Sequence, residues 1–407
     1  MTFLHDTEVF TVMENQAAPF PGIENIEFLQ NDFITRYSAM AGIDESMIRE
    51  LIRLKDMLLL RDPFVRLLWE FHDLLYRQER PLGEVIPEDP KLGRLLGDNL
   101  RGIFYYLLIL SGMPLMIRRY EEKKWPESVR DEILSDLSVW ITHHKRNFGT
   151  PGLAWMVMPW FQSHINLRLV SLGRLQFNTR HPYPCPATVF RSRKNGRVLA
   201  LADGKKRFTA AGLLDDLQDE PSEDSWVSVW EETPDCWRGN PVPPDGFALK
   251  TPVTLLKSEW EIMLKKDDPV INIHIPESGP LKPAACRDSL LRARDFFAEY
   301  LPDYPWKAFF CDSWLLDPQL QSILKPDSNI LAFQNLGYQL PFPREADTIF
   351  RCFGVKGARD GVGTVPLRSS LQHTFARFLK EGHRFHYGAM ILLREDLEKE
   401  SPYPRHE

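Results

Sequence analysis

Hydrophobic residues recur at three- and four-residue steps along the first part of the chain. After Asp44, which suits a helix start, apolar side chains at positions 47, 48, 51, 54 and 58 form one stripe, as on an amphipathic helix. Similar patterns predict helices over residues 64–76, 95–110 and 127–144, and glycine and proline at 149–152 precede another apolar segment, 153–169. Residues 41–170 therefore read as a helical domain after an extended segment, 1–40.

The periodicity then changes to the alternation of a half-buried strand, which begins at residues 172–177. Residues 187–193 and 197–202 flank Asn195-Gly196, a pair that favours a tight hairpin turn. Residues 205–250 contain many prolines and acidic residues, so they are expected to form an irregular insertion.

A strand–helix–strand unit follows. Residues 270–275 read as a strand, 283–300 as a helix and 307–316 as a second strand. A helical crossover of this length makes the two strands parallel neighbours. Further strands are expected at 329–333, 348–353 and 385–393, and helices at 318–324 and 369–380. The fold class is thus α+β or α/β: a helical N-terminal domain, then a mixed sheet flanked by helices over 171–395, and a tail, 396–407.

Composition and charge narrow the function classes. A chain of 407 residues that is 43% hydrophobic can build large cores. The net charge of −6 and the lack of a long basic run argue against nucleic acid. The most apolar stretch, 103–116, contains Pro114 and is too short to span a bilayer, so no membrane partner is expected.

The five cysteines are widely spaced, and no signal-peptide pattern is visible at the start. The cysteines fit reduced thiols better than a disulfide framework, and they have no metal-ligand spacing. We therefore expect a cytoplasmic protein with no metal that acts on a small molecule. The oligomeric state is left open.

Polar residues on the central strands are the candidates for chemistry. Asn272 and His274 share one face of a strand whose other face carries isoleucines. His274 could act as a general base or be a hydrogen-bonded core histidine. Arg174 and Gln176, on the polar face of the first strand, either line the same cleft or hold two domains together.

The second strand of the unit carries two candidate nucleophiles. Cys311 and Ser313 share a face, and a parallel neighbour could bring either near His274; a buried structural thiol is the alternative. The turn after 275 leads into a helix start, where backbone N–H groups attract phosphate. The glycines of 354–363 match no nucleotide-binding motif and favour a surface loop.

Five segments resemble a bacterial family of acyltransferase-domain proteins that pairs an N-acyltransferase N-terminal helical domain with a GNAT-like C-terminal domain. These are Leu172-Gly173-Arg174-Leu175-Gln176-Phe177, His274-Ile275-Pro276-Glu277-Ser278-Gly279-Pro280-Leu281, Cys311-Asp312-Ser313-Trp314-Leu315-Leu316-Asp317-Pro318, Ser328-Asn329-Ile330 and Ser370-Leu371-Gln372. The resemblance covers residues 40–393.

The resemblance implies a GNAT-like sheet whose two parallel strands splay apart to admit acetyl-CoA or another acyl-CoA, with the pyrophosphate near the next helix start. It implies cofactor contacts at Glu277, Ser278, Gly279, Lys282 and Cys286, and a substrate cleft at Asn272, Arg174 and Gln176. The usual Gln/Arg-x-x-Gly-x-Gly/Ala phosphate loop is absent between Glu277 and Cys286, so the phosphate site is altered or CoA is not the ligand.

Three functions remain open. The first is transfer of an acyl group, acetyl foremost, from acyl-CoA to an amine, with His274 as base and Ser313 or Cys311 protonating the thiolate. The second is a non-catalytic module that binds a small molecule or a protein and keeps the GNAT-like fold. The third is a thiol hydrolase that uses Cys311 with His274.

Overall fold

The computed structural model describes residues 17–86, 92–179, 181–215 and 224–405. The chain divides into two compact units, residues 1–172 with 276–278, and residues 173–275 with 279–407. The first sixteen residues of the expected N-terminal segment, residues 216–223 of the insertion and the last two of the tail lie outside the described residues. Each unit is taken separately below.

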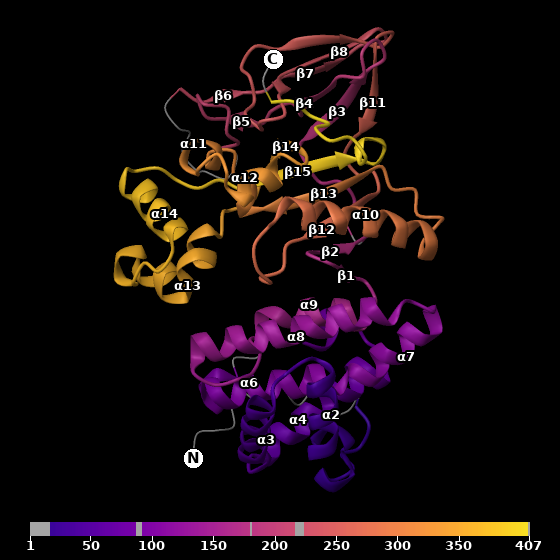
Figure 1. The fold of residues 1–407 in the computed structure, drawn as a ribbon, viewed down its shortest axis with the longest axis vertical. Helices are drawn as coiled ribbons and strands as arrows, with labels where there is room; N and C mark the ends of the chain where they lie inside the picture. The colour runs from indigo at the N-terminus through magenta and orange to yellow at the C-terminus, as the bar shows by residue number, and fades with distance from the viewer. Residues whose placement is uncertain (1–16, 87–91, 180, 216–223, 406–407) are drawn as a thin grey trace. The chain divides into compact units, whose positions relative to one another are not determined.

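The first unit is helical, as the apolar periodicity predicted for residues 41–170 (Figure 1). The expectation of an extended segment over 1–40 is wrong for its last ten residues, which form a helix. Its α-helices are α2 (Asn31–Met40), α3 (Glu45–Leu59), α4 (Asp62–His72), α5 (Leu82–Val85), α6 (Gly93–Ser111), α7 (Met113–Lys123), α8 (Glu127–Phe148) and α9 (Met158–Ile165). Asp44 caps α3 by accepting a hydrogen bond from the Met47 N–H. The short strand β1 (Val170–Leu172) ends the unit.

Helix α6 forms the centre of this unit. Every side chain from Ile103 to Leu110 is fully buried. One continuous helical stretch of the described residues, Gly93–Lys123, is long and apolar enough to cross a membrane by length and composition. Because 83% of its most apolar window is buried inside the unit, the stretch is typical of a core helix.

Two glycines allow α6 to touch another segment backbone to backbone. A Cβ added to Gly152 would lie 2.6 Å from the carbonyl carbon of Gly102. The N–H of Leu153 donates to the Gly102 carbonyl oxygen at 3.0 Å. The approach is closer than any side chain permits.

The second unit is organised around a mixed sheet, which confirms the predicted fold class (Figure 1). Its strands lie in the order β2, β12, β13, β15, β14. Their bounds are β2 (Leu175–Asn178), β12 (Val270–His274), β13 (Ala308–Ser313), β14 (Tyr338–Pro341) and β15 (Gly388–Leu393). Helix α10 (Pro283–Tyr300) connects β12 to β13, and these two strands pair in parallel as predicted.

Smaller sheets occupy the sequence between β2 and β12. The hairpin of β3 (Ala187–Ser192) and β4 (Val198–Ala202) is confirmed, and β9 (Pro241–Val242) and β11 (Trp260–Leu264) extend it to the order β11-β3-β4-β9. The segment expected to be irregular contains short strands: β5 (Arg207–Phe208), β6 (Trp226–Val227), β7 (Trp230–Glu232), β8 (Cys236–Gly239) and, just after it, β10 (Val253–Leu256).

Two predicted strands are helices. Residues 329–333 lie in α12 (Asn329–Gln334), and 348–353 begin α13 (Thr348–Asp360). A short apolar run fits either state, and the Ser328 side chain caps α12 by accepting from the Ile330 N–H. The predicted glycine loop instead continues α13 to Asp360, with a break at Gly354, where φ is 70°. Strand β14 was not predicted.

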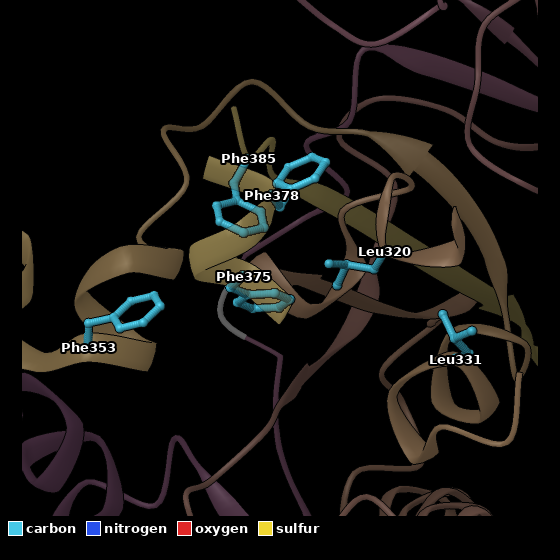
Figure 2. Close-up of a cluster of buried hydrophobic side chains, with 6 residues drawn as sticks. All are labelled: Leu320, Leu331, Phe353, Phe375, Phe378 and Phe385. Carbon is cyan, nitrogen blue, oxygen red and sulfur yellow. The ribbon is translucent and has the colours of Figure 1, made fainter. Parts of the chain in front are cut away.

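Helices α11 (Leu320–Ile323), α12, α13 and α14 (Ser370–Lys380) build a second apolar core beside the sheet. Figure 2 shows its six buried side chains: Leu320, Leu331, Phe353, Phe375, Phe378 and Phe385. The rings of Phe375 and Phe385 lie 4.7 Å apart. This core fixes α14 to the segment that follows β13.

Candidate functional site

The strongest candidate site is the polar face at the end of β12. Antiparallel register places His274 opposite Gln176 and Asn272 opposite Asn178 on β2. Side chains directly opposite each other share a face of the sheet, so four polar side chains gather there. The sequence had placed Asn272, His274 and Gln176 among the candidates and had missed Asn178.

His274 is held by a short contact. Its Nε2 lies 2.6 Å from the Asn178 Nδ2. When the amide donates, Nε2 accepts and the imidazole proton sits on Nδ1. Asn272 is buried, and its Nδ2 donates to the His181 carbonyl oxygen at 2.7 Å. The Asn178 amide therefore sets the tautomer and the orientation of His274.

A cavity of about 380 Å³ opens onto this face. Its lining includes His181, Asn272, His274, Phe310, Asp312 and Phe342. Asn272 pairs with Phe310 in the parallel ladder, so Asp312, two residues later, faces the same side as His274. The lining thus combines aromatic rings with groups that can exchange protons.

Asp312 belongs to the site but was not among the residues predicted from the sequence. Burial raises the pKa of its carboxyl, while Arg344 opposes the rise. The Arg344 Nη1 lies 3.2 Å from the Asp312 Oδ2. Only the observed register reveals that Asp312, rather than its neighbours, faces His274.

Cys311 and Ser313 lie on the other face of β13. Cys311 pairs with Ile273, so it projects opposite His274, and burial raises the pKa of its thiol well above the usual range. The Ser313 hydroxyl accepts the Leu315 N–H at 3.1 Å. The structure brings neither side chain to the His274 face.

The β12–β13 ladder ends before the strands do. The last parallel pair is Ile273 with Cys311, whereas His274 continues along β2. Asp312 and Ser313 continue along β15, opposite Ala389 and Gly388. Each strand thus follows its outer neighbour beyond that point.

The turn between β12 and α10 is fastened by Arg174. Its Nη2 donates to the Gly279 carbonyl oxygen at 2.7 Å, and its Nε donates to that of Pro280 at 3.1 Å. Burial lowers the pKa of Arg174. Gly279 has a φ of 99°, a conformation that side chains disfavour. Arg174 therefore holds the turn.

The expected cofactor residues lie along this turn and the first helical turn. Glu277, Ser278 and Lys282 are exposed, and Lys282 is the N-cap residue of α10. Cys286 is buried, and burial raises the pKa of its thiol to about 11 although Arg174 acts against it. The thiol is part of the packing under α10.

No cluster of three or more His, Cys, Asp or Glu side chains that could hold a metal ion occurs in the described part of the chain.

Two family models match the chain. The N-acyltransferase N-terminal domain matches residues 32–167, and the GNAT-like C-terminal domain matches residues 169–391. These matches confirm the resemblance drawn from the sequence. A search of curated proteins gave no match.

Solved acyltransferase structures share the fold. One, a mutant in complex with octanoyl-CoA, is 19% identical with a TM-score of 0.59, covering 96% of this chain and 95% of that chain. A second, in complex with decanoyl-CoA and teicoplanin, has the same values. A third, in complex with CoA and 10C-teicoplanin, is 20% identical with the same TM-score and coverage. The chain thus has an acyltransferase fold.

Proposed function

The chain belongs to the family with a GNAT-like C-terminal domain, and from that premise we propose that it transfers an acyl group from an acyl-CoA to an amine. The observation that carries the proposal is the polar face of β2 and β12. That face ends at His274, where the parallel β12–β13 ladder stops. Similar structures are complexes with octanoyl-CoA and decanoyl-CoA, which supports a thioester as the donor.

His274 takes the proton of the attacking amine in this proposal. A neutral amine is needed to attack the thioester carbonyl, and an imidazole can accept its proton near neutral pH. The contact with Asn178 keeps the ring oriented. Because that contact occupies Nε2, the basic nitrogen, the Asn178 amide must release Nε2 before it accepts the amine proton. Asp312, on the same face, carries a carboxylate that favours the imidazolium once it forms.

The donor would lie along the ends of β12 and β13. Its pantetheine arm can hydrogen-bond to strand backbone that the ladder leaves beyond Ile273 and Cys311. Lys282 and the first N–H groups of α10 are the groups that could meet phosphate. We assign Cys311 and Ser313 no proton transfer, because both project to the opposite face.

The test is thiol release from acetyl-CoA, octanoyl-CoA and decanoyl-CoA with a panel of amines. We expect His274→Ala to lower kcat by about 10²- to 10⁴-fold, the usual contribution of a general base. His383→Ala, at an exposed histidine near the end of α14, is the matched control and should keep full activity. Unchanged turnover in His274→Ala would overturn the assigned role.

A second function, non-catalytic binding, is favoured by the turn between β12 and α10. It lacks the usual phosphate loop, and Pro276, Pro280 and Pro283 contribute no N–H donors. Isothermal titration with the same thioesters separates the two functions. Saturable binding without acyl transfer to any amine would support the binding module.

A further inference from the structure

Helix α14 has two chemically distinct faces. Phe375 and Phe378 are buried in the core of Figure 2. His373, Arg377 and Lys380 are exposed, and their spacing of four and three residues aligns them on the opposite face. The apolar face is fully explained by packing, and the basic face has no structural role of that kind.

The charge of this region differs from that of the chain. Residues 344–384 contain eight Lys or Arg and four Asp or Glu, a net charge of +4, whereas the whole chain carries −6. The basic residues of α13 are balanced locally, as in the Arg351–Asp347 pair at 2.8 Å. Among the described residues, Arg377 and Lys380 form no ion pair, so their charge is available to a partner.

The basic face lies on an element attached to the carboxyl end of β13. Trp314 directly follows β13, and its ring centroid is 6.3 Å from that of Phe375 on α14. Just beyond α14, the Arg384 carbonyl oxygen accepts the Gln319 Nε2 at 2.9 Å. Figure 1 shows α14 beside the edge at which β13 ends and β15 begins.

The turn before α10 is a poor cradle for the pyrophosphate of free CoA. Two of its positions, Pro276 and Pro280, and the first residue of α10, Pro283, are prolines without an N–H. The Lys282 N–H donates within the turn, to the Pro280 carbonyl oxygen at 3.0 Å. Arg174 donates to turn carbonyls. A donor that needs less phosphate binding at this turn would suit the site better.

We propose that the basic face of α14 docks an acidic acyl carrier protein, which presents its acyl-phosphopantetheine arm to the gap between β12 and β13. This inference rests on the proposed acyl transfer and specifies its donor. Acyl-CoA and the carrier share the pantetheine thioester. The carrier has a single phosphate in its arm and derives its affinity from protein contacts, which is consistent with a basic docking face and a weak pyrophosphate site.

The same bonds form and break with either donor. The carbonyl carbon forms a bond to the amine nitrogen, and the C–S bond breaks. The amine proton passes to His274, and the arm's thiolate leaves and takes up that proton from the imidazolium, directly or through water, which returns His274 to its neutral form.

The deciding experiment measures binding of an acidic acyl carrier protein whose arm bears an octanoyl group through a non-hydrolysable amide. Fluorescence anisotropy gives Kd for the full chain and for the double variant Arg377→Glu/Lys380→Glu. We expect the double variant to bind about tenfold more weakly or worse, and wild-type affinity to fall with salt. Lys194→Glu/Lys250→Glu reverses two exposed lysines of the same unit and should leave Kd unchanged.

If the carrier shows no saturable binding, or if both double variants bind it equally well, the docking proposal is wrong. Thiol release from octanoyl-CoA and from the octanoyl-loaded carrier separates it from acyl transfer. If transfer from octanoyl-CoA has the same kcat/KM as transfer from the carrier, and Arg377→Glu/Lys380→Glu does not change it, the carrier is not the preferred donor. Acyl transfer itself would still be supported. If the carrier binds in a charge-dependent way but neither donor transfers its acyl group, docking would be supported and acyl transfer would be wrong.

Discussion

Single residues in the second unit carry unusual protonation energetics, and Asp317 is the clearest case. Its side chain is fully buried, and burial raises its pKa to about 6. The His386 and Gln319 N–H groups donate to its two oxygens at 2.8 and 3.0 Å and so oppose the rise. The carboxyl joins the end of the β13 segment to the start of β15.

Asp317→Asn should change how stability depends on pH. Between the unfolded pKa near 3.8 and the folded pKa of about 6, the native state binds more protons than the unfolded state. Ionisation of Asp317 therefore destabilises the fold as pH rises through that window, by on the order of 3 kcal/mol. Urea unfolding should show the variant gaining about that amount relative to wild type between pH 4 and pH 7.5. A constant difference would contradict the assignment.

At the scale of the element, α14 depends on a reciprocal cap. The Ser369 hydroxyl accepts the Gln372 N–H at 3.2 Å, and the Gln372 Oε1 accepts the Ser369 N–H at 3.1 Å. The Gln372 Nε2 also donates to the Cys352 carbonyl oxygen at 2.7 Å. The cap thus starts α14 and ties it to α13.

Ser369→Ala should lower the free energy of unfolding by about 1 kcal/mol, because a helix N–H loses its acceptor. Ser370→Ala, one position inside the helix and equally exposed, is the control and should change it by less than about 0.5 kcal/mol. Denaturant titration measures both. Equal losses in the two variants would mean that the capping hydroxyl has no special role.

The whole molecule holds its five cysteines as free thiols in very different surroundings. Cys185, Cys286 and Cys311 are buried, and burial raises the pKa of each. Burial also raises the pKa of Cys352 to about 12. Cys236 is partly exposed.

Thiol titration at pH 8 should find one fast-reacting cysteine in the native protein and five in denaturant, since only thiolates react. Cys236→Ser should remove the fast phase. Rapid labelling of Cys311 would contradict this expectation and would support the thiol hydrolase as the function.

Periodicity predicted the parts of the fold that local patterns encode. The helical first unit, the hairpin around Asn195-Gly196 and the parallel pairing of β12 with β13 follow from apolar spacing, a turn signal and a crossover length. Short apolar runs failed at 329–333 and 348–353, because a run of five or six residues suits a strand or a packed helix equally. Strand β14 ends in Pro341. Because a proline argues against a strand, the sequence pattern did not predict this one.

The site was predictable only in part. Alternation along one strand put Asn272 and His274 together, but the contributions of Asn178 and Asp312 depend on register between strands far apart in sequence. The same register separates Cys311 from His274. Distances between strands are set by tertiary packing, which no pattern within a strand encodes.

The backbone contact between Gly102 and Gly152 has a consequence for how relatives of this chain can be recognised. Any larger residue at position 152 would put its Cβ within 2.6 Å of the Gly102 backbone, and no rotamer relieves that clash because Cβ is common to all of them. A Cβ at position 102 would instead lie 2.5 Å from Cε1 of the His144 ring, so a smaller side chain at 144 would relieve that clash. A chain that retains this crossing must therefore keep glycine at the position of Gly152, so that glycine marks the crossing in related sequences.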